Sequence, residues 1–327
     1  MLGTKSVEWI LAPMDGVTDY PYRNAWVETF GAYSTMRLAV SPFVSLVPGG
    51  GIRLSHLRDL FPENNRMSVE PQFLGNEAGY FLPMAEALHA LGYSSIDWNL
   101  GCPVRHVARK QRGSGLLPYP DRIRSFLESV LPSSPLALSV KLRLGYASGE
   151  EIYPVLDVLN SFPLSYVAIH PRTGIQLYGG RADWDAFEAL LPRLRHRCVY
   201  SGDIDSVAKA EAFCGRFPRI GAIMLGRGVI SNPFLPCSLS GFDFGKEEAR
   251  SLFAAFVQAL LFHYQSAGLR GDALLRRQKL FWGQFRGEYV PEGAFGLVKR
   301  LDSVEGYVRL CRQWFGQSWA GGWREQE

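Results

Sequence analysis

The feature that most constrains the fold is a regular alternation over residues 7–226, in which short β-branched or apolar runs are mostly followed by helical patterns. The eight runs are Val7–Met14, Ser34–Ser41, Val69–Gly75, Ser95–Gly101, Leu136–Leu144, Tyr166–His170, Cys198–Gly202 and Ala222–Gly226. The helical patterns are Tyr20–Phe30, Glu77–Leu91, Asp121–Leu131, Glu150–Leu159, Trp184–Leu194 and Val207–Phe213. Strands alternating with helices indicate βαβ units and a parallel sheet. Eight such units in roughly 240 residues predict a closed (β/α)8 barrel.

An open, doubly wound sheet is the alternative, but it usually has fewer strands and a Gly-rich fingerprint after its first strand, which is absent here. The strand pattern ends after Pro236. Ser238–Gly245 has the composition of a linker. Three segments of helical spacing follow: Glu247–Gln265, Ala273–Phe285 and Val298–Trp314. We therefore predict an α/β protein, with a TIM barrel as the catalytic domain over residues 1–240 and a small all-helical C-terminal domain over residues 241–327.

Composition narrows the functional classes. The formal net charge is +4, a mild excess that is compatible with nucleic acid but also common in other enzymes. The five cysteines are scattered without a Cys-x-x-Cys pair, and there is no His-Glu-x-x-His, so neither a disulfide framework nor a metal site is expected. There is no apolar signal-peptide core at the start and no bilayer-spanning stretch. We expect a cytoplasmic monomer that binds neither metal nor membrane.

One cysteine, Cys102, lies in the run Asn99-Leu100-Gly101-Cys102-Pro103 at the end of a predicted strand. The carboxyl ends of strands form the active face of parallel α/β folds. Gly101 and Pro103 predict a sharp turn there. We expect the thiol to be displayed to a substrate.

Side chains alternate between the two faces of a strand, and this alternation places further polar residues inside the barrel near the carboxyl ends of its strands, a region called the mouth below. In residues 137–144, Lys141 and Arg143 share one face, and the aliphatic residues share the other. The same reasoning adds Gln72, Asn99 and His170. Each of them alone is more often a hydrogen-bonded core group. Because all of them lie at strand C-terminal ends, the set favours a site.

Two glycine-bearing turns follow the last two predicted strands: Ser201-Gly202-Asp203 and Gly226-Arg227-Gly228. In barrels these two positions commonly bind a phosphate through backbone N–H groups. Arg227 would add a bidentate donor. The pair predicts a phosphorylated ligand such as FMN.

The stretch after Cys102 is basic, with no acidic residue before Gly115. Its cations are Arg105, Arg109, Lys110 and Arg112. We expect Gly113 and Gly115 to make this loop flexible. Such a loop suits a polyanion lying over the active face, although a solvated surface loop explains the charge equally well.

Seven motifs in chain order resemble the tRNA-dihydrouridine synthase family. They are Leu11–Asp19, Gln72–Gly75, Asp97–Pro103 with Val107 and Gly113–Gly115, Lys141–Gly145, His170–Thr173, Ser201–Ile204 and Gly226–Gly228. In the C-terminal region, residues 276–279 are loosely similar to the family's tRNA-contacting helix. The sequence departs from the family at Pro171, which is usually glycine, and at Ser201, which is usually asparagine.

The resemblance implies a role for each matching residue. FMN would be bound by Pro13, Met14, Asp15, Gln72, Lys141, His170, Ser201, Gly202, Asp203, Gly226 and Arg227. The target uridine of tRNA would contact Asn99, Arg143 and Arg172, and the tRNA body Arg276 and Arg277. NADPH would reduce FMN, the flavin would deliver hydride to C6 of uracil, and Cys102 would protonate C5.

Two other functions fit the same residues. One is a flavin barrel that reduces a free pyrimidine, similar to dihydroorotate or dihydropyrimidine dehydrogenases. The helical domain and the basic loop argue against it, since a free base needs neither. The other is a non-catalytic tRNA-binding protein, which predicts tRNA binding without flavin.

Overall fold

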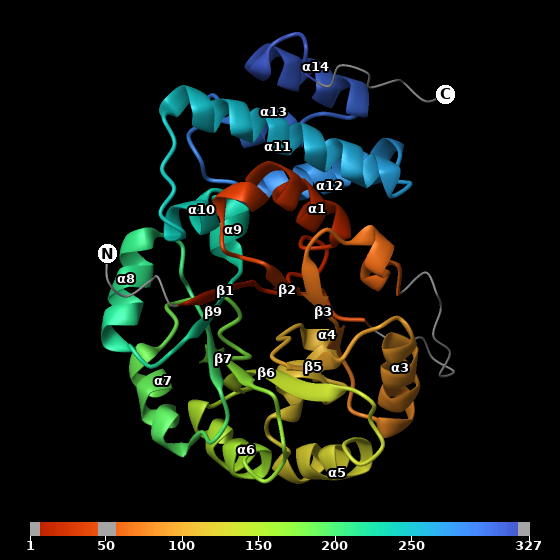
Figure 1. The fold of residues 1–327 in the computed structure, drawn as a ribbon, viewed down its shortest axis with the longest axis vertical. Helices are drawn as coiled ribbons and strands as arrows, with labels where there is room; N and C mark the ends of the chain where they lie inside the picture. The colour runs from red at the N-terminus through yellow and green to blue at the C-terminus, as the bar shows by residue number, and fades with distance from the viewer. Residues whose placement is uncertain (1–6, 45–56, 320–327) are drawn as a thin grey trace.

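The barrel is closed by a strand that is interrupted at one residue. We describe the protein from a computed structural model, which describes residues 7–44 and 57–319 (Figure 1). Within these ranges one parallel sheet has the order β3-β2-β1-β9-β8-β7-β6-β5-β4. The strands are β1 (Glu8–Leu11), β2 (Leu38–Val40), β3 (Ser68–Glu70), β4 (Gln72–Phe73), β5 (Ser95–Leu100), β6 (Ala137–Gly145), β7 (Val167–Thr173), β8 (Cys198–Ser201) and β9 (Ala222–Leu225).

β3 and β4 are separated only by Pro71, so they occupy the place of the single strand predicted at Val69–Gly75. β3 pairs with β2, and β4 pairs with β5, which closes the ring. Proline has no N–H to donate to a ladder, which accounts for the interruption. Its carbonyl still accepts a hydrogen bond from the Asp97 N–H at 2.8 Å. The predicted (β/α)8 barrel is confirmed.

Helices cover the outside of the barrel (Figure 1). They are α1 (Tyr20–Phe30), α3 (Ala78–Ala90), α5 (Pro120–Val130), α6 (Ile152–Leu159), α7 (Trp184–Leu190) and α8 (Val207–Arg216). Each lies within one or a few residues of its predicted bounds, because apolar residues at helical spacing define the buried face. Shorter helices are α4 (Arg105–Ala108), α9 (Arg227–Ser231) and α10 (Leu235–Leu239).

The inside of the barrel is divided into an apolar and a polar part. Side chains from β1, β2 and β7–β9 form a small apolar cluster that includes Ile10, Val199 and Met224. On the opposite strands, β3, β5 and β6, three buried polar side chains contact one another: Glu70, Asp97 and Ser139. The expected parity of β5 and β6 is therefore confirmed, and a polar floor lies below the mouth on one side.

Four helices form the C-terminal region as far as residue 319, and they lie over α1 in Figure 1. They are α11 (Lys246–Ser266), α12 (Gly271–Gln284), α13 (Ala294–Lys299) and α14 (Val304–Phe315). The Phe256 ring of α11 contacts Tyr22 and Phe30 of α1 at centroid distances of 5.9 and 5.4 Å. Because barrel and helices share this aromatic core, the domain boundary at residue 240 stays a prediction. Among the helices of residues 7–44 and 57–319, none combines the length and the apolar character that a bilayer span needs.

Two sequence expectations in this region are wrong. The predicted linker begins inside α10, which runs to Leu239. The single helix predicted at Val298–Trp314 is two helices, because Ser303 has an extended backbone and caps α14. Its hydroxyl accepts a hydrogen bond from the Gly306 N–H at 3.2 Å. A serine that caps a helix satisfies an end N–H, which favours a new helix start over continuation.

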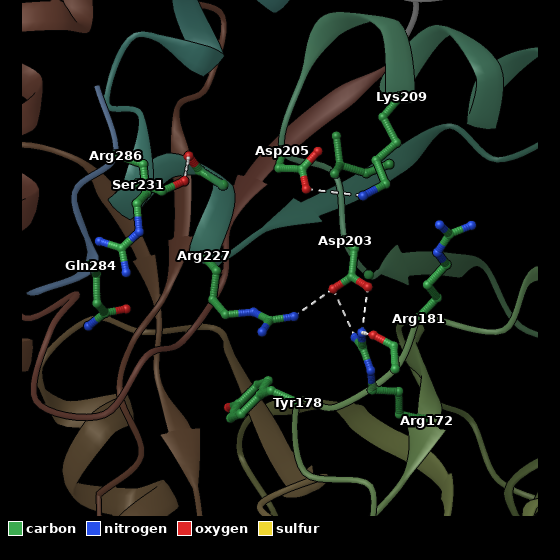
Figure 2. A pocket seen from close by; sticks show the side chains of 14 residues that line it. Arg172, Tyr178, Arg181, Asp203, Asp205, Lys209, Arg227, Ser231, Gln284 and Arg286 are labelled. Carbon is green, nitrogen blue, oxygen red and sulfur yellow. Dashed lines mark hydrogen bonds and ion pairs between the residues drawn. The ribbon is translucent and has the colours of Figure 1, made fainter. Parts of the chain in front are cut away.

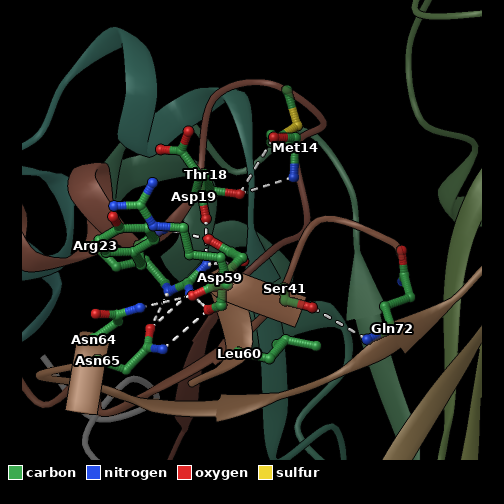
Figure 3. A network of polar contacts seen from close by, with 12 residues as sticks. Met14, Thr18, Asp19, Arg23, Ser41, Asp59, Leu60, Asn64, Asn65 and Gln72 are labelled. Atoms are coloured by element: carbon green, nitrogen blue, oxygen red, sulfur yellow. Dashed lines mark hydrogen bonds and ion pairs between the residues drawn. The ribbon is translucent and has the colours of Figure 1, made fainter. Parts of the chain in front are cut away.

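A fully buried arginine ties the segment after β2 to the start of α1 (Figure 3). Arg23 donates to Asp59 Oδ2 at 3.1 Å and to Asn65 Oδ1 at 2.6 Å. It also donates to the Thr18 carbonyl at 2.7 Å, and the Thr18 hydroxyl accepts from the Met14 N–H at 2.9 Å. A buried charge is stable only when it is paired and hydrogen-bonded. This network therefore holds the loop between β1 and α1 in place.

Candidate active site

Cys102 lies on a turn that is clamped from two sides. The Asn99 side-chain oxygen accepts hydrogen bonds from the N–H groups of Gly101 and Cys102, at 3.0 and 2.8 Å. The Cys102 carbonyl accepts from the N–H and the hydroxyl of Ser114, both at 3.0 Å. The thiol itself is half-buried. The backbone of the turn is thus fixed, while Cys102 as a residue stays partly exposed.

Gly113 and Gly115 are buried and allow the chain to pack closely against its neighbours. The expectation that they make the loop flexible is therefore wrong. Residues 113–116 form a buried 3-10 turn. Gly113 has φ +57°, and a Cβ there would lie 2.6 Å from the Cys102 carbonyl oxygen. Only glycine permits that backbone conformation together with that approach. The cations before the turn are divided: Arg112 pairs with Glu77 at 3.2 Å, while Arg105, Arg109 and Lys110 are exposed.

The environment of Cys102 raises the pKa of its thiol. Burial is the largest cause, and the Asp15 carboxylate adds to it. The Val104 N–H and the Arg143 guanidinium act in the opposite direction without cancelling it. An ordinary thiol has a pKa of about 8.5, so this one is protonated at neutral pH. That state suits a proton donor.

A chain of amide contacts runs from Cys102 along the mouth. Asn99 donates to Gln72 Oε1 at 2.7 Å, and Gln72 donates to Asp97 Oδ2 at 2.7 Å. Lys141 lies on β6 directly beside Asn99. The structure therefore brings together Cys102, Asn99, Gln72 and Lys141, as the sequence predicts.

Below this row, two carboxyl groups share one hydroxyl. Ser139 Oγ lies 3.1 Å from Glu70 Oε1 and 3.1 Å from Asp97 Oδ1. A hydroxyl has one proton to donate, so the second contact needs a proton on a carboxyl oxygen. Burial raises the pKa of both carboxyls, and the nearby charge of Glu70 raises that of Asp97 further, to about 8. The pKa of Lys141 is lowered to about 8, mainly by burial and then by repulsion from Arg143, and Asp97 opposes this shift.

Two buried arginines hold the loop that follows β7. Arg143 donates to the carbonyls of Gly101, Thr173 and Leu177, at 3.0, 2.8 and 2.6 Å. Arg172 donates to the carbonyls of Gly179 and Gly180, at 3.1 and 2.9 Å. Arg172 is only 1% exposed. Most of its donors are used within the protein, so it positions the loop here, and its contact with uridine stays a prediction.

This loop presents an aromatic ring that sequence reasoning missed. Tyr178 is 48% exposed. The guanidinium groups of Arg143 and Arg227 lie over its ring at 5.3 and 4.7 Å. Its only signal in the sequence is an aromatic residue before Gly179-Gly180 in the loop after the strand that carries His170. It joins two predicted site residues, Arg143 of β6 and Arg227 at the start of α9.

His170 is neutral in this setting. Burial and then the surrounding cations, among them Lys141 and Arg143, hold its pKa well below the usual range. Arg172 Nη1 lies 3.0 Å from His170 Nε2. Arginine can only donate, so Nε2 is the accepting nitrogen of the ring. The other ring nitrogen then carries the proton.

A cavity of about 460 Å³ lies beside the loops after β8 and β9 (Figure 2). Both glycine turns contribute to it through Gly202, Asp203, Arg227 and Gly228. A Cβ on Gly228 would lie 2.2 Å from the Ile204 carbonyl, so glycine is required for the two loops to approach. Ser201 ends β8 beside Met224 of β9, at the same edge.

One carboxylate organises the cations of this cavity. Asp203 accepts from Arg172 at 2.8 and 2.5 Å and from Arg227 at 2.6 Å (Figure 2). Although burial opposes it, these arginines and the Ala182 N–H lower the pKa of Asp203. Arg181, Lys209 and Arg286 also line the cavity. Its cations outnumber its two carboxylates, which fits a phosphate group.

The remaining predicted site residues lie on the loop after β1 and on α12. Ala12 Cβ and Met14 Sδ each lie 3.6 Å from the place of a Cβ on Gly226, so the loop after β1 packs against the turn after β9. Asp15 lines a second cavity, together with Asp19 and Arg277. Arg277 is bound to this loop rather than free, since it donates to the Gly16 carbonyl. Arg276 is exposed.

Over the described ranges there is no cluster of three or more His, Cys, Asp or Glu that could hold a metal ion.

A parallel barrel with a cysteine and a row of polar side chains at its mouth defines an enzyme of the (β/α)8 class. The sequence model described as Dihydrouridine synthase (Dus) matches residues 10–269. The chain belongs to the dihydrouridine synthase family.

Individual relatives agree with this assignment. The chain is 28% identical over 259 residues to a probable tRNA-dihydrouridine synthase of Rickettsia conorii, covering 79% of this chain and 77% of the relative. It is 27% identical over 316 residues to tRNA-dihydrouridine synthase B of Vibrio vulnificus, covering 91% and 94%. Histamine dehydrogenase from Rhizobium sp. 4-9 superposes with a TM-score of 0.52 over 78% of this chain and 49% of that one. Its 11% identity makes this a likeness of fold alone.

Proposed function

We propose that this protein reduces the C5–C6 double bond of a uridine in the D-loop of tRNA to dihydrouridine, with FMN as cofactor and NADPH as reductant. Family membership and the names of the relatives support the reaction. The observation that carries the proposal is the fixed turn at Cys102, whose protonated, half-buried thiol lies beside the Asn99–Gln72–Lys141 row.

The residues of the mouth fit a flavin mononucleotide. At one end, Gln72 and Lys141 offer an amide and an ammonium group, which suit the oxygen and nitrogen edge of the ring. At the other end, the cation-rich cavity with Arg227 suits the phosphate. Bound FMN would supply the hydride that reaches C6 of uracil, after its own reduction by NADPH.

The protein's own part is to orient the uracil and to deliver the proton. Asn99 is already held by Gln72 and by the turn, so its position is set before a substrate arrives. Cys102 protonates C5, and the thiolate that remains regains a proton from solvent. One hydride and one proton together saturate the double bond, so the reaction balances. Arg143 and Tyr178, which contact each other, would border the bound uracil.

The tRNA would lie across the exposed cations beside this mouth. Arg105, Arg109 and Lys110 lie just after Cys102, and Arg276 lies on α12. Extracting a base from its stack costs a few kcal/mol. Phosphate contacts with such cations offset that cost, and they weaken as salt is raised. We propose residues 241–327 as the tRNA-binding region on the same grounds.

The test is reduction of unmodified tRNA by the purified protein with FMN and NADPH, followed by mass analysis of the nucleosides. We expect uridine to gain two hydrogens in wild type. Cys102→Ala should still oxidise NADPH but form dihydrouridine more slowly by a factor of roughly 10² to 10⁴. Cys198→Ala is the matched control, because Cys198 starts β8, at the end of the strand remote from the mouth.

Two results would favour the other functions. Reduction of free uracil or orotate as fast as tRNA would indicate a reductase of free pyrimidines. Binding of tRNA by a protein that takes up no flavin would indicate a non-catalytic tRNA-binding protein.

A further inference from the structure

The cavity beside the loops after β8 and β9, here called the phosphate cavity, has more cationic side chains than carboxylates in its wall. Arg172 and Arg227 both pair with Asp203, and Lys209 pairs with Asp205 at 3.0 Å. Two further cations in its wall, Arg181 and Arg286, have no carboxylate within ion-pair distance over the described ranges. Charge that is not balanced within a cavity favours an anionic ligand.

Arg286 comes from the C-terminal region, directly after α12. Its Nη1 donates to the carbonyls of Gly283 and Phe285, at 3.0 and 2.7 Å. Its main-chain N–H donates to the Ser231 carbonyl at 2.9 Å, at the end of the helix that starts with Arg227. The backbone and one guanidinium nitrogen are therefore fixed relative to the loop after β9.

The rest of the Arg286 guanidinium is left for a ligand. Nε and Nη2 make no hydrogen bond with any residue that the structure describes. The neighbouring Gln284 amide also lines the cavity and is likewise without a hydrogen bond to the described residues. Figure 2 shows Arg286 and Gln284 across the cavity from Arg181, with Arg227 between the two sides.

We propose that Arg286 is a ligand of the phosphate group of FMN, so that the C-terminal helical region completes the cofactor site. The inference rests on the proposed function, because it requires a flavin with a phosphate in this cavity. A phosphate monoester carries about −1.5 to −2 charges at pH 7. A guanidinium held by its own helix end loses little freedom on binding such a group, and its planar fork matches phosphate oxygens.

Comparison of FMN with riboflavin, which lacks the phosphate, tests this contact. Flavin is removed from the full-length protein, and its return is followed by quenching of flavin fluorescence. Arg286→Gln should raise the Kd for FMN at least tenfold, equivalent to about 1.4 kcal/mol. The Kd for riboflavin should change less than twofold. Arg286→Met, which keeps the methylene stem, should behave like Arg286→Gln, and Arg286→Lys should recover part of the affinity.

Arg300→Gln is the control, because Arg300 is an exposed arginine of the same region outside the cavity and should leave both Kd values unchanged. Unchanged FMN affinity in Arg286→Gln and Arg286→Met would overturn the proposal. Equal loss for FMN and riboflavin would overturn it too, because the residue would then act on the fold. Weaker tRNA binding with normal FMN affinity would assign Arg286 to an RNA phosphate instead. A wild-type protein that binds neither flavin would refute the proposed function itself, which is a different outcome.

Discussion

Arg277 of α12 donates a hydrogen bond to the main-chain carbonyl of Gly16, across 261 residues of sequence. The same guanidinium lies 3.5 Å from Asp19 and 5.6 Å from the centre of the Tyr264 ring. Tyr264 in turn donates to Asp19 at 2.7 Å. The helical region therefore binds the loop that we propose to line the flavin.

Removing this contact should loosen the loop after β1. Arg277→Met keeps the aliphatic stem but leaves the Gly16 carbonyl and Asp19 without a cation, which should lower the free energy of unfolding by about 1–3 kcal/mol. FMN affinity should fall as well. Urea unfolding and flavin titration measure the two effects. Arg276→Met on the same helix should change neither, because Arg276 is exposed. If both variants weaken only tRNA binding, Arg277 is an RNA contact alone.

Asp19 should make stability depend on pH. Burial, opposed by Arg277 and assisted by Asp59, raises the pKa of Asp19 to about 6. The unfolded chain has the ordinary value of about 3.9, so between these values the folded state binds more protons, and stability falls as pH rises through this window. The side chain is 18% exposed, so little of the effect is lost to solvent.

The measurement is urea unfolding of wild type and Asp19→Asn at several pH values from 4 to 7. The variant cannot titrate at this position, so the difference between the two proteins isolates Asp19. We expect wild type to lose roughly 2–3 kcal/mol relative to the variant between pH 4 and pH 7. A difference that does not change with pH would show that the Asp19 carboxyl titrates normally.

The raised pKa of Cys102 predicts the pH dependence of tRNA reduction. A general acid works only while it holds its proton, so the rate should stay level at neutral pH and fall above the ordinary thiol value of about 8.5. Single-turnover oxidation of the reduced flavin by tRNA reports this step. Cys102→Ser should be slow but without that fall, since a hydroxyl keeps its proton there. A wild-type rate that declines already between pH 6 and 8 would contradict a raised pKa.

Gly113 should tolerate no side chain. Gly113→Ala places a Cβ 2.6 Å from the Cys102 carbonyl, in a backbone conformation with φ +57°. We expect a loss of stability of about 1–3 kcal/mol and a further loss of dihydrouridine formation, because the turn must move. Gly92→Ala is the control: Gly92 has φ +93° with nothing within 4 Å of its Cβ position. It shares the backbone strain but not the clash, so equal activity in the two variants would argue against this role of Gly113.

Much of the mouth could be predicted from sequence, because a strand repeats every two residues and a barrel collects its strand ends on one face. Parity alone predicts that Lys141 lies on the inner face of its strand, and the glycine turns after β8 and β9 line one cavity. The position of Cys102 followed from the turn residues around it. These are local patterns, and each is contained in fewer than ten consecutive residues.

Contacts between residues far apart in the chain are seen only in the tertiary structure. Arg143 and Arg172 matched the family's motifs, but their use of loop carbonyls cannot be inferred from a motif. Neither the Arg277–Gly16 contact nor the entry of Arg286 into the phosphate cavity has any sequence signal, since a surface arginine on a helix has the same local pattern as one that reaches another element. Periodicity determines which face of an element is buried. Which partner that face meets is decided when the whole chain packs, because only then do donors and acceptors hundreds of residues apart come within hydrogen-bond distance.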